Sequence, residues 1–245
     1  MTPKKTSLKL TALFAATLLA FSAQAKIITD VDGNKIDIPD RVERVADLWH
    51  ANNQIVLLLG GADKLVATTT TIAANPWYAE VYPNIKNVPV LTNGETIQVE
   101  ELLSQKPEAV LLSKKSMLTE VNQAGLKGVR VSFQDFDGLK KTVRITAEVL
   151  GDKAPAVAES YIKELEDNIQ FVESRIKDVK EAQRPTVLHI TKGTDLLMID
   201  GGKSMIGEWI KMAGGKSVLP DEANMVTVTM ESIVEANPDV IIIGS

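Results

Sequence analysis

A tryptophan and a histidine, Trp49 and His50, directly follow the apolar segment 42–48. A large aromatic ring and an imidazole, placed where a buried strand enters a loop, can stack on a chelate or bind its metal ion. A histidine in such a place is also often structural. His189 lies inside an apolar segment, where a structural role is favoured. His50 is therefore the candidate metal ligand, with a structural role as its alternative.

Polar and aromatic residues also follow the other apolar segments. Ligands of open α/β sheets bind beyond the carboxyl ends of the strands, so residues at those positions are candidate ligand contacts. They are Trp49, His50, Asn52, Thr70, Thr71, Trp77, Lys114 and Phe133 in the first half of the chain, and Lys192, Ser204 and Asn224 in the second. The lysines would suit an anionic ligand, but surface lysines need no such explanation. Trp77, beside Pro76, could instead pack its loop onto the domain.

Short β-branched runs alternate with longer amphipathic segments along the chain, which predicts an α/β fold with mainly parallel strands joined by helices. The glycine pairs at 60–61 and 214–215 are typical of helix C-caps. Strands are predicted at 42–48, 65–70, 109–113, 129–133, 186–191 and 240–243, and helices at 53–59, 99–105, 139–150 and 207–212.

The segment from about 155 to 183 carries apolar residues at steps of three and four, opposite a face rich in Lys and Glu. This period predicts one long helix. At 1.5 Å per residue it would span roughly 40 Å, longer than a small lobe is wide. A coiled-coil arm, or a helix lying on one large domain, is the alternative.

The two sides of this helix repeat the same pattern at a constant spacing. Glu100 corresponds to Glu231, and the Pro-acid pair at 107–108 corresponds to the pair at 238–239, each followed by an apolar strand. Helix, Pro and strand can recur by chance in an α/β protein, but the paired Glu residues favour a true repeat. The sequence therefore predicts two similar lobes joined by one long rigid helix, with a cleft between them.

From Lys26 to Ser245 the chain resembles the periplasmic substrate-binding proteins of ABC importers whose lobes are joined by one long helix. The resemblance is carried by segments 41–46, 59–66 and 99–108 in the first half, and by 213–215 and 229–242 in the second. Each motif alone is weakly specific, whereas their order over the whole chain is strong. This class binds iron-siderophore complexes, haem and cobalamin.

The resemblance implies a binding protein and not an enzyme, without a permanent cofactor, whose ligand itself contains a metal. It also implies that Glu100 and Glu231 dock onto arginines of a permease dimer. An acid in the first turn of a helix is also ordinary, because the macrodipole favours it there.

A molybdate or tungstate oxyanion or a nickel complex is the alternative ligand. A chelatase-like enzyme is a further alternative, but one cleft histidine and no cysteine supply little for its chemistry.

Composition narrows the class of protein further. With 27 basic and 32 acidic residues among 245, the net charge is −5, which offers no bulk attraction for nucleic acid. Cysteine is absent, which excludes disulfides, zinc-finger spacings and a lipid anchor on an N-terminal cysteine. We expect a monomer that diffuses to its permease.

Residues 1–25 read as a cleavable export signal, with lysines before an apolar run of about a dozen residues and small residues at the cleavage site. The expected location is the periplasm. The expected divisions are 26–150 for the first lobe, 151–183 for the connecting helix and 184–245 for the second lobe. We expect that second lobe to be incomplete, because the chain ends after the strand at 240–243, where the first lobe continues through further elements.

Overall fold

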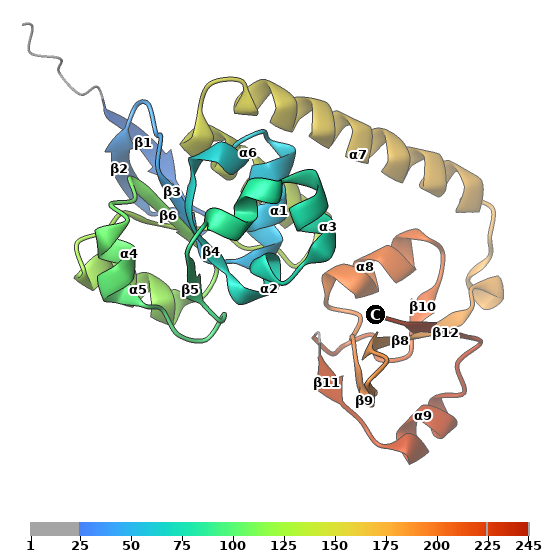
Figure 1. Cartoon of the computed structure of the whole chain (residues 1–245). Coiled ribbons are helices and arrows are strands. Elements are labelled where there is room, and N and C mark those ends of the chain that lie inside the picture. Colours follow the sequence, from blue (N-terminus) through green and yellow to red (C-terminus); the bar gives the residue numbers. More distant parts are fainter. Residues whose placement is uncertain (1–24, 224, 245) are drawn as a thin grey trace, which may run out of the picture.

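The computed structural model describes residues 25–223 and 225–244; the predicted export signal lies outside this range, apart from Ala25. The chain forms two lobes below one long helix (Figure 1). Within these described residues, no helix is both long and apolar enough to cross a bilayer.

The first lobe is built on a five-stranded, fully parallel sheet of order β5-β4-β3-β6-β7. A hairpin of two antiparallel strands precedes it. The strands of the lobe are β1 (Ala25–Thr29), β2 (Lys35–Pro39), β3 (Val45–Asp47), β4 (Leu65–Thr69), β5 (Val90–Thr92), β6 (Ala109–Leu112) and β7 (Gly128–Arg130). Its helices are α1 (His50–Leu58), α2 (Thr70–Ala73), α3 (Pro76–Val81), α4 (Val99–Ser104), α5 (Lys115–Gln123) and α6 (Phe136–Leu150), with 3-10 turns η1 (Ala62–Lys64) and η2 (Pro83–Asn87).

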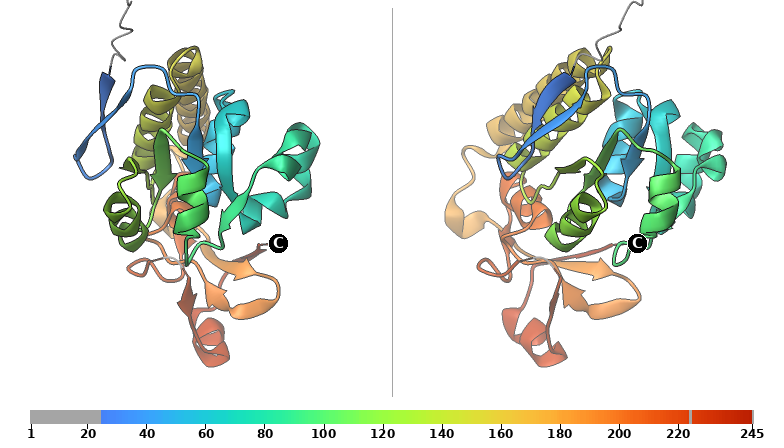
Figure 2. Two further views of the ribbon diagram at one scale, coloured as in Figure 1. Left: turned by 60° about the vertical axis from the view of Figure 1, so that its left-hand side comes forward. Right: turned by 90° about the vertical axis from the view of Figure 1, so that its left-hand side faces the viewer.

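Both faces of this sheet are covered. Val45 belongs to an apolar cluster with residues of α1, α3 and α6, whereas the next residue, Ala46, belongs to a separate cluster with residues of α4 and α5. The same alternation holds for Leu111 and Leu112 in β6. Successive side chains of a strand point to opposite faces, so these apolar runs produce a three-layer lobe (Figure 2).

The connecting helix α7 (Ala154–Ile176) ends before Gln183, the predicted end. The chain turns there and passes through the 3-10 turn η3 (Glu181–Gln183) before it enters the second lobe. The fully buried face of α7 consists of Ala154, Ala158 and Ile162 near its start, while Phe171 near its end is 58% exposed. The helix therefore packs on the first lobe with its N-terminal half.

The second lobe has a mixed sheet around its longest strand, β8. Its elements are β8 (Thr186–Lys192), β9 (Asp195–Ile199), α8 (Met205–Met212), β10 (Lys216–Ser217), β11 (Val226–Thr227), α9 (Met230–Ala236) and β12 (Val240–Ile243). Strands β10 and β12 run parallel to β8, whereas β9 runs antiparallel to it. The α/β class and the two-lobed plan are confirmed, but the second sheet is less purely parallel than the repeat predicts.

Several local predictions differ from the structure in informative ways. Helix α1 begins at His50 and not near residue 53, because the buried strand β3 already ends at Asp47. The hairpin β1–β2 and the strands β5 and β9 were not predicted. Gly60 and Gly214, with φ of 75° and 89°, do occupy the left-handed conformation expected just past a helix end.

Candidate functional site

The second lobe meets the first lobe at the carboxyl end of the parallel sheet. The backbone N–H of Phe136, a few residues beyond β7, donates a hydrogen bond of 2.6 Å to Glu208 on α8. The residues that follow β3, β4, β6 and β7 lie at this same end of the sheet, because parallel strands share one carboxyl edge. The candidate site is therefore this edge together with the part of the second lobe that faces it.

An aromatic pair stands at this edge. The rings of Trp49 and Phe133 lie 5.0 Å apart between centroids and are inclined by 51°. Both side chains are half-buried and pack against the core of the lobe. The structure thus brings together two predicted ligand residues that are far apart in the sequence, and both remain partly exposed.

His50, next to Trp49, opens α1 with an exposed side chain. Protein crowds one side of its imidazole, and this desolvation lowers the pKa of His50 below its ordinary value. A lower pKa favours the neutral ring, which is the form that binds a metal ion. Among the described residues, no group of three or more His, Asp or Glu is placed to hold a metal ion by itself.

Asn52 does not reach the surface. Its side chain is fully buried, where its amide nitrogen donates to Asp47 at 2.8 Å and its amide oxygen accepts from Thr146 at 2.9 Å. The prediction that Asn52 contacts the ligand is therefore wrong, because both ends of its amide already have partners inside the lobe.

Ser204 is a second correction. Its hydroxyl caps α8 by accepting from the N–H of Gly207 at 3.0 Å, and it donates to the carbonyl of Gly201 at 2.7 Å. Only 5% of the residue is exposed. The serine was predicted as a ligand contact, but it is an N-cap.

Of the remaining predicted residues, those that the structure describes are exposed, but some of them already have hydrogen-bond or ion-pair partners within the protein. The Thr70 hydroxyl donates to the carbonyl of Thr92, and the Lys114 ammonium lies 2.6 Å from the Glu95 carboxylate. Thr71 and Lys192 are exposed, and Asn224 lies outside the described residues. Trp77 is 79% exposed, so the alternative that it packs its loop onto the lobe is wrong.

Sequence reasoning missed a buried polar group below the aromatic pair. Asp47, at the end of β3, is fully buried and accepts hydrogen bonds from Asn52 and from the N–H of Trp49. Burial raises its pKa to about 8, although these hydrogen bonds oppose the shift. The available signal was an acidic residue at the end of an apolar run, followed five and six positions later by two asparagines.

A neighbouring network fixes the start of α1 in the same region. Asn53 is fully buried, donates to the carbonyl of Asp47 at 2.9 Å and accepts from Thr68 at 2.7 Å. The hydroxyl of Tyr78 donates to the carbonyl of Asn53, and burial together with the Asp47 charge raises the pKa of this tyrosine. These bonds hold the backbone that presents Trp49 and His50.

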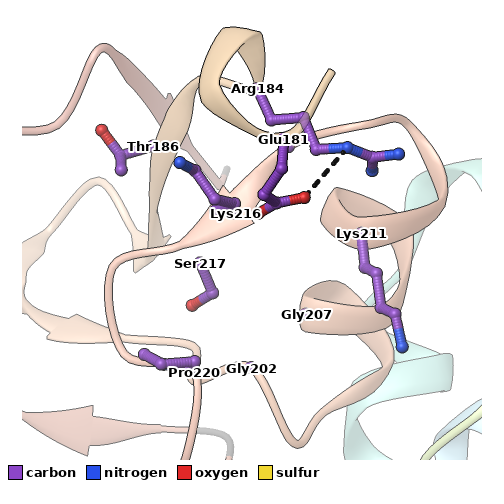
Figure 3. A pocket seen from close by; sticks show the side chains of 10 residues that line it. Glu181, Arg184, Thr186, Gly202, Gly207, Lys211, Lys216, Ser217 and Pro220 are labelled. Carbon is purple, nitrogen blue, oxygen red and sulfur yellow. Dashed lines mark ion pairs between the residues drawn. The ribbon is translucent and has the colours of Figure 1, made fainter. Parts of the chain in front are cut away.

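A cavity of about 510 Å³ lies elsewhere, on the second lobe beside η3 and α8 (Figure 3). It carries the basic residues Arg184, Lys211 and Lys216, but their charged ends point in different directions, and Glu181 pairs with Arg184 at 3.3 Å. Because these charged groups point away from one another, they do not converge on one anion. This cavity contains no predicted ligand residue.

Comparison with known proteins identifies the family. A model described as periplasmic binding protein matches residues 45–245. The chain belongs to the periplasmic binding protein family. Membership of a family of binding proteins confirms the prediction that the chain is not an enzyme.

Two curated proteins and one solved structure are similar to this chain. The chain is 23% identical over 223 residues to an uncharacterized ABC transporter substrate-binding lipoprotein, YvrC, of Bacillus subtilis, with 88% of this chain and 68% of YvrC covered. It is 28% identical over 178 residues to the high-affinity heme uptake protein IsdE of Staphylococcus aureus, with 70% and 59% covered. The molybdate periplasmic binding protein MolA of Haemophilus influenzae, solved with molybdate, superimposes with a TM-score of 0.80 at 22% identity, over 88% of this chain and 73% of MolA.

Proposed function

We propose that this chain captures a metal chelate, namely a ferric siderophore, haem or cobalamin, between its lobes and delivers it to an ABC permease in the periplasm. The observation that carries the proposal is the Trp49–Phe133 pair at the edge where the second lobe meets the first. A pair of partly exposed aromatic rings suits the flat, apolar surface of a large chelate better than a small oxyanion.

Each residue has a distinct part in this proposal. Trp49 and Phe133 would stack on the chelate, and His50 would supply an imidazole ligand where the chelate leaves a coordination position of its metal open. Thr71, Trp77 and Lys192 contact the periphery of the ligand from exposed positions, with Thr70 and Lys114 beside them. The protein keeps no cofactor of its own, because the metal arrives and leaves with the ligand.

The test is a binding panel of haem, cobalamin, a ferric siderophore and molybdate, followed by absorption spectra and calorimetry. For a chelate, Trp49→Ala is expected to weaken binding about 10- to 100-fold, since stacked aromatic residues dominate such sites. His50→Ala should change the visible spectrum of the bound chelate. His189→Ala is the matched control, because His189 is held by Asp200 at 2.7 Å within the second lobe and should leave that spectrum unchanged.

Binding of molybdate alone, with affinity unaffected by Trp49→Ala, would instead support the oxyanion alternative. That alternative needs polar groups to hold a small anion. The hydroxyl of Thr70 and the ammonium of Lys114 already have partners in this structure, which favours the chelate.

Docking to the permease forms the second part of the proposal. Glu100 and Glu231 both stand second in their helices, α4 and α9, and both are exposed. Two carboxylates at equivalent places on the two lobes can each pair with an arginine of a dimeric partner, and joint engagement strengthens binding.

The double change Glu100→Ala with Glu231→Ala should abolish uptake while it leaves ligand affinity within about twofold. The matched control is Glu101→Ala with Glu235→Ala, which removes exposed acids from the same two helices. Equal loss of uptake in the control pair, or lost ligand affinity in the test pair, would contradict the assignment.

A further inference from the structure

Helix α8 of the second lobe reaches the first lobe through one acidic side chain. The Glu208 carboxylate accepts the N–H of Phe136 at 2.6 Å, across 72 positions of sequence. Figure 1 shows α8 as the part of the second lobe that lies nearest to the first lobe, below α7. Glu208 is half-buried at this contact.

The partner of Glu208 is the first residue of a helix. Phe136 opens α6, and the N–H groups of a first turn have no carbonyl within the helix to donate to. Asp135 satisfies only part of this turn, because its carboxylate accepts from Gly138 at 2.6 Å. Glu208 supplies the missing acceptor from the other lobe, and the positive end of the helix dipole strengthens the bond.

The opposite end of α8 is held differently. The backbone of Gly214, just after α8, lies against the Ile176 side chain at the end of α7. A side chain larger than that of glycine would touch Ile176 there. A cavity of about 450 Å³ separates α7 from α8 beside Glu208, Lys211 and Met212. The packing between these two helices is therefore open on this side of α8.

A long helix resists bending, so any rotation between the lobes falls in the segment between Ile176 and β8, whose only regular element is the short turn η3. A second fixed point removes that rotation. Glu208 provides it, because it joins α8 to a helix that is rigidly packed in the first lobe, where Val143, Val149 and Leu150 of α6 are fully or almost fully buried.

The contact also lies next to the proposed ligand site. Phe136 follows three residues after Phe133, whose ring packs at a tilt against that of Trp49. We propose that Glu208 is a positioning residue: its bond to the start of α6 sets the angle between the lobes and the distance of the second lobe from Phe133. The effect on ligand affinity rests on the proposed function, whereas the effect on lobe geometry does not.

The absence of cysteine makes the test direct. Spin labels are attached to Glu80→Cys on α3 and Glu235→Cys on α9, two exposed positions on different lobes, and pulsed electron resonance gives the distribution of distances between them. Without ligand, Glu208→Ala should widen this distribution about twofold, because the second fixed point is lost. Glu208→Gln, whose amide oxygen can still accept the N–H, should recover most of the narrow distribution.

Glu173→Ala is the matched control, since Glu173 lines the same cavity on α7 but makes no bond to α6 that we find in the described residues. Circular dichroism verifies that each variant is folded. Unchanged distances in Glu208→Ala, or equal broadening in Glu173→Ala, would overturn the proposal.

A ligand measurement separates this proposal from the one on which it partly rests. With whichever ligand of the panel binds, Glu208→Ala should weaken binding about 3- to 10-fold and Glu173→Ala should not. If none of haem, cobalamin, ferric siderophore or molybdate binds, the proposed function fails, while the distance distributions still decide the role of Glu208.

Discussion

The first lobe buries both faces of its sheet, whereas the second lobe buries a much smaller set of residues. In the first lobe, two separate clusters cover the two faces of β3 and β6. In the second, the cluster consists of Leu188, Ile190 and Ile199 with a few half-buried neighbours. Ile241 and Ile243 of β12 remain 54% and 58% exposed.

The two lobes differ in how much of each apolar strand is covered by helices, and not only in the number of residues. Strands of both lobes carry the same kind of apolar run, for example 109–112 and 240–243. In the first lobe, helices cover such a strand on both sides, so its run contributes fully to stability. In the second lobe, no described element covers β12, so among the described residues its run buries less apolar area than that of β6. We therefore expect the lobes to differ in stability.

The largest expected effect compares two buried core leucines, one from each lobe. Leu111→Ala in β6 should lower the free energy of unfolding by about 3–5 kcal/mol, because the dense core cannot collapse onto the cavity. Leu188→Ala in β8, equally buried, should cost about 2–3 kcal/mol, since its surroundings can relax. Urea unfolding followed by Trp49 for the first lobe and Trp209 for the second measures both. An equal or greater loss in the second lobe would refute the comparison.

The next effect is a pH dependence confined to the first lobe. The pKa of buried Asp47 is about 8 in the folded state, above its value in the unfolded chain, so folding takes up a proton between these two pH values. Stability is then greatest at acid pH and falls as the pH rises towards 8, by up to about 1.4 kcal/mol per pH unit. Unfolding of the first lobe between pH 5 and 8 measures this slope.

Asp47→Asn is the control for that slope, because asparagine keeps hydrogen-bonding groups at the same place and does not titrate. The variant should unfold with a much flatter pH dependence and should be more stable than the parent protein at pH 8. A slope that is the same in both proteins would assign the pH dependence to other groups.

The smallest of the three effects sharpens the picture of the second lobe. Ser204→Ala removes the N-cap of α8 and should lower the free energy of unfolding by about 1–2 kcal/mol. Faster amide hydrogen exchange in α8 should be the first measurable sign of this loss. Ser174→Ala removes a serine hydroxyl from the exposed part of α7 and should change stability by less than about 0.5 kcal/mol. Slower or unchanged exchange in α8 would indicate that the lobe does not depend on this cap.

The sequence predicted the order of elements well where apolar runs were long. The strands β4, β6, β8 and β12 lie close to their predicted places, because each carries an apolar run bounded by polar or turn residues. It missed β5 and β9, whose residues 90–92 and 195–199 give no strong alternation and become strands only by pairing with neighbours. The end of α7 was also misplaced, since the apolar period continues beyond the point where the chain turns.

The candidate site was predicted less evenly. Trp49 and Phe133 were selected from their positions after strands, and they do meet. Asn52 and Ser204 were selected by the same rule but serve the fold, because a polar residue after a strand can as readily cap a helix or satisfy a buried partner. Sequence position alone does not distinguish these two uses.

Local periodicity and composition by themselves determined that this chain is an α/β protein with two lobes and a long connecting helix. The tertiary structure alone decided that Asp47 is buried with a raised pKa, and that Glu208 caps a helix of the other lobe. The physical reason is that burial and hydrogen-bond partners depend on which distant segments meet. A sequence pattern indicates that a residue is apolar or polar, but only packing decides what surrounds it.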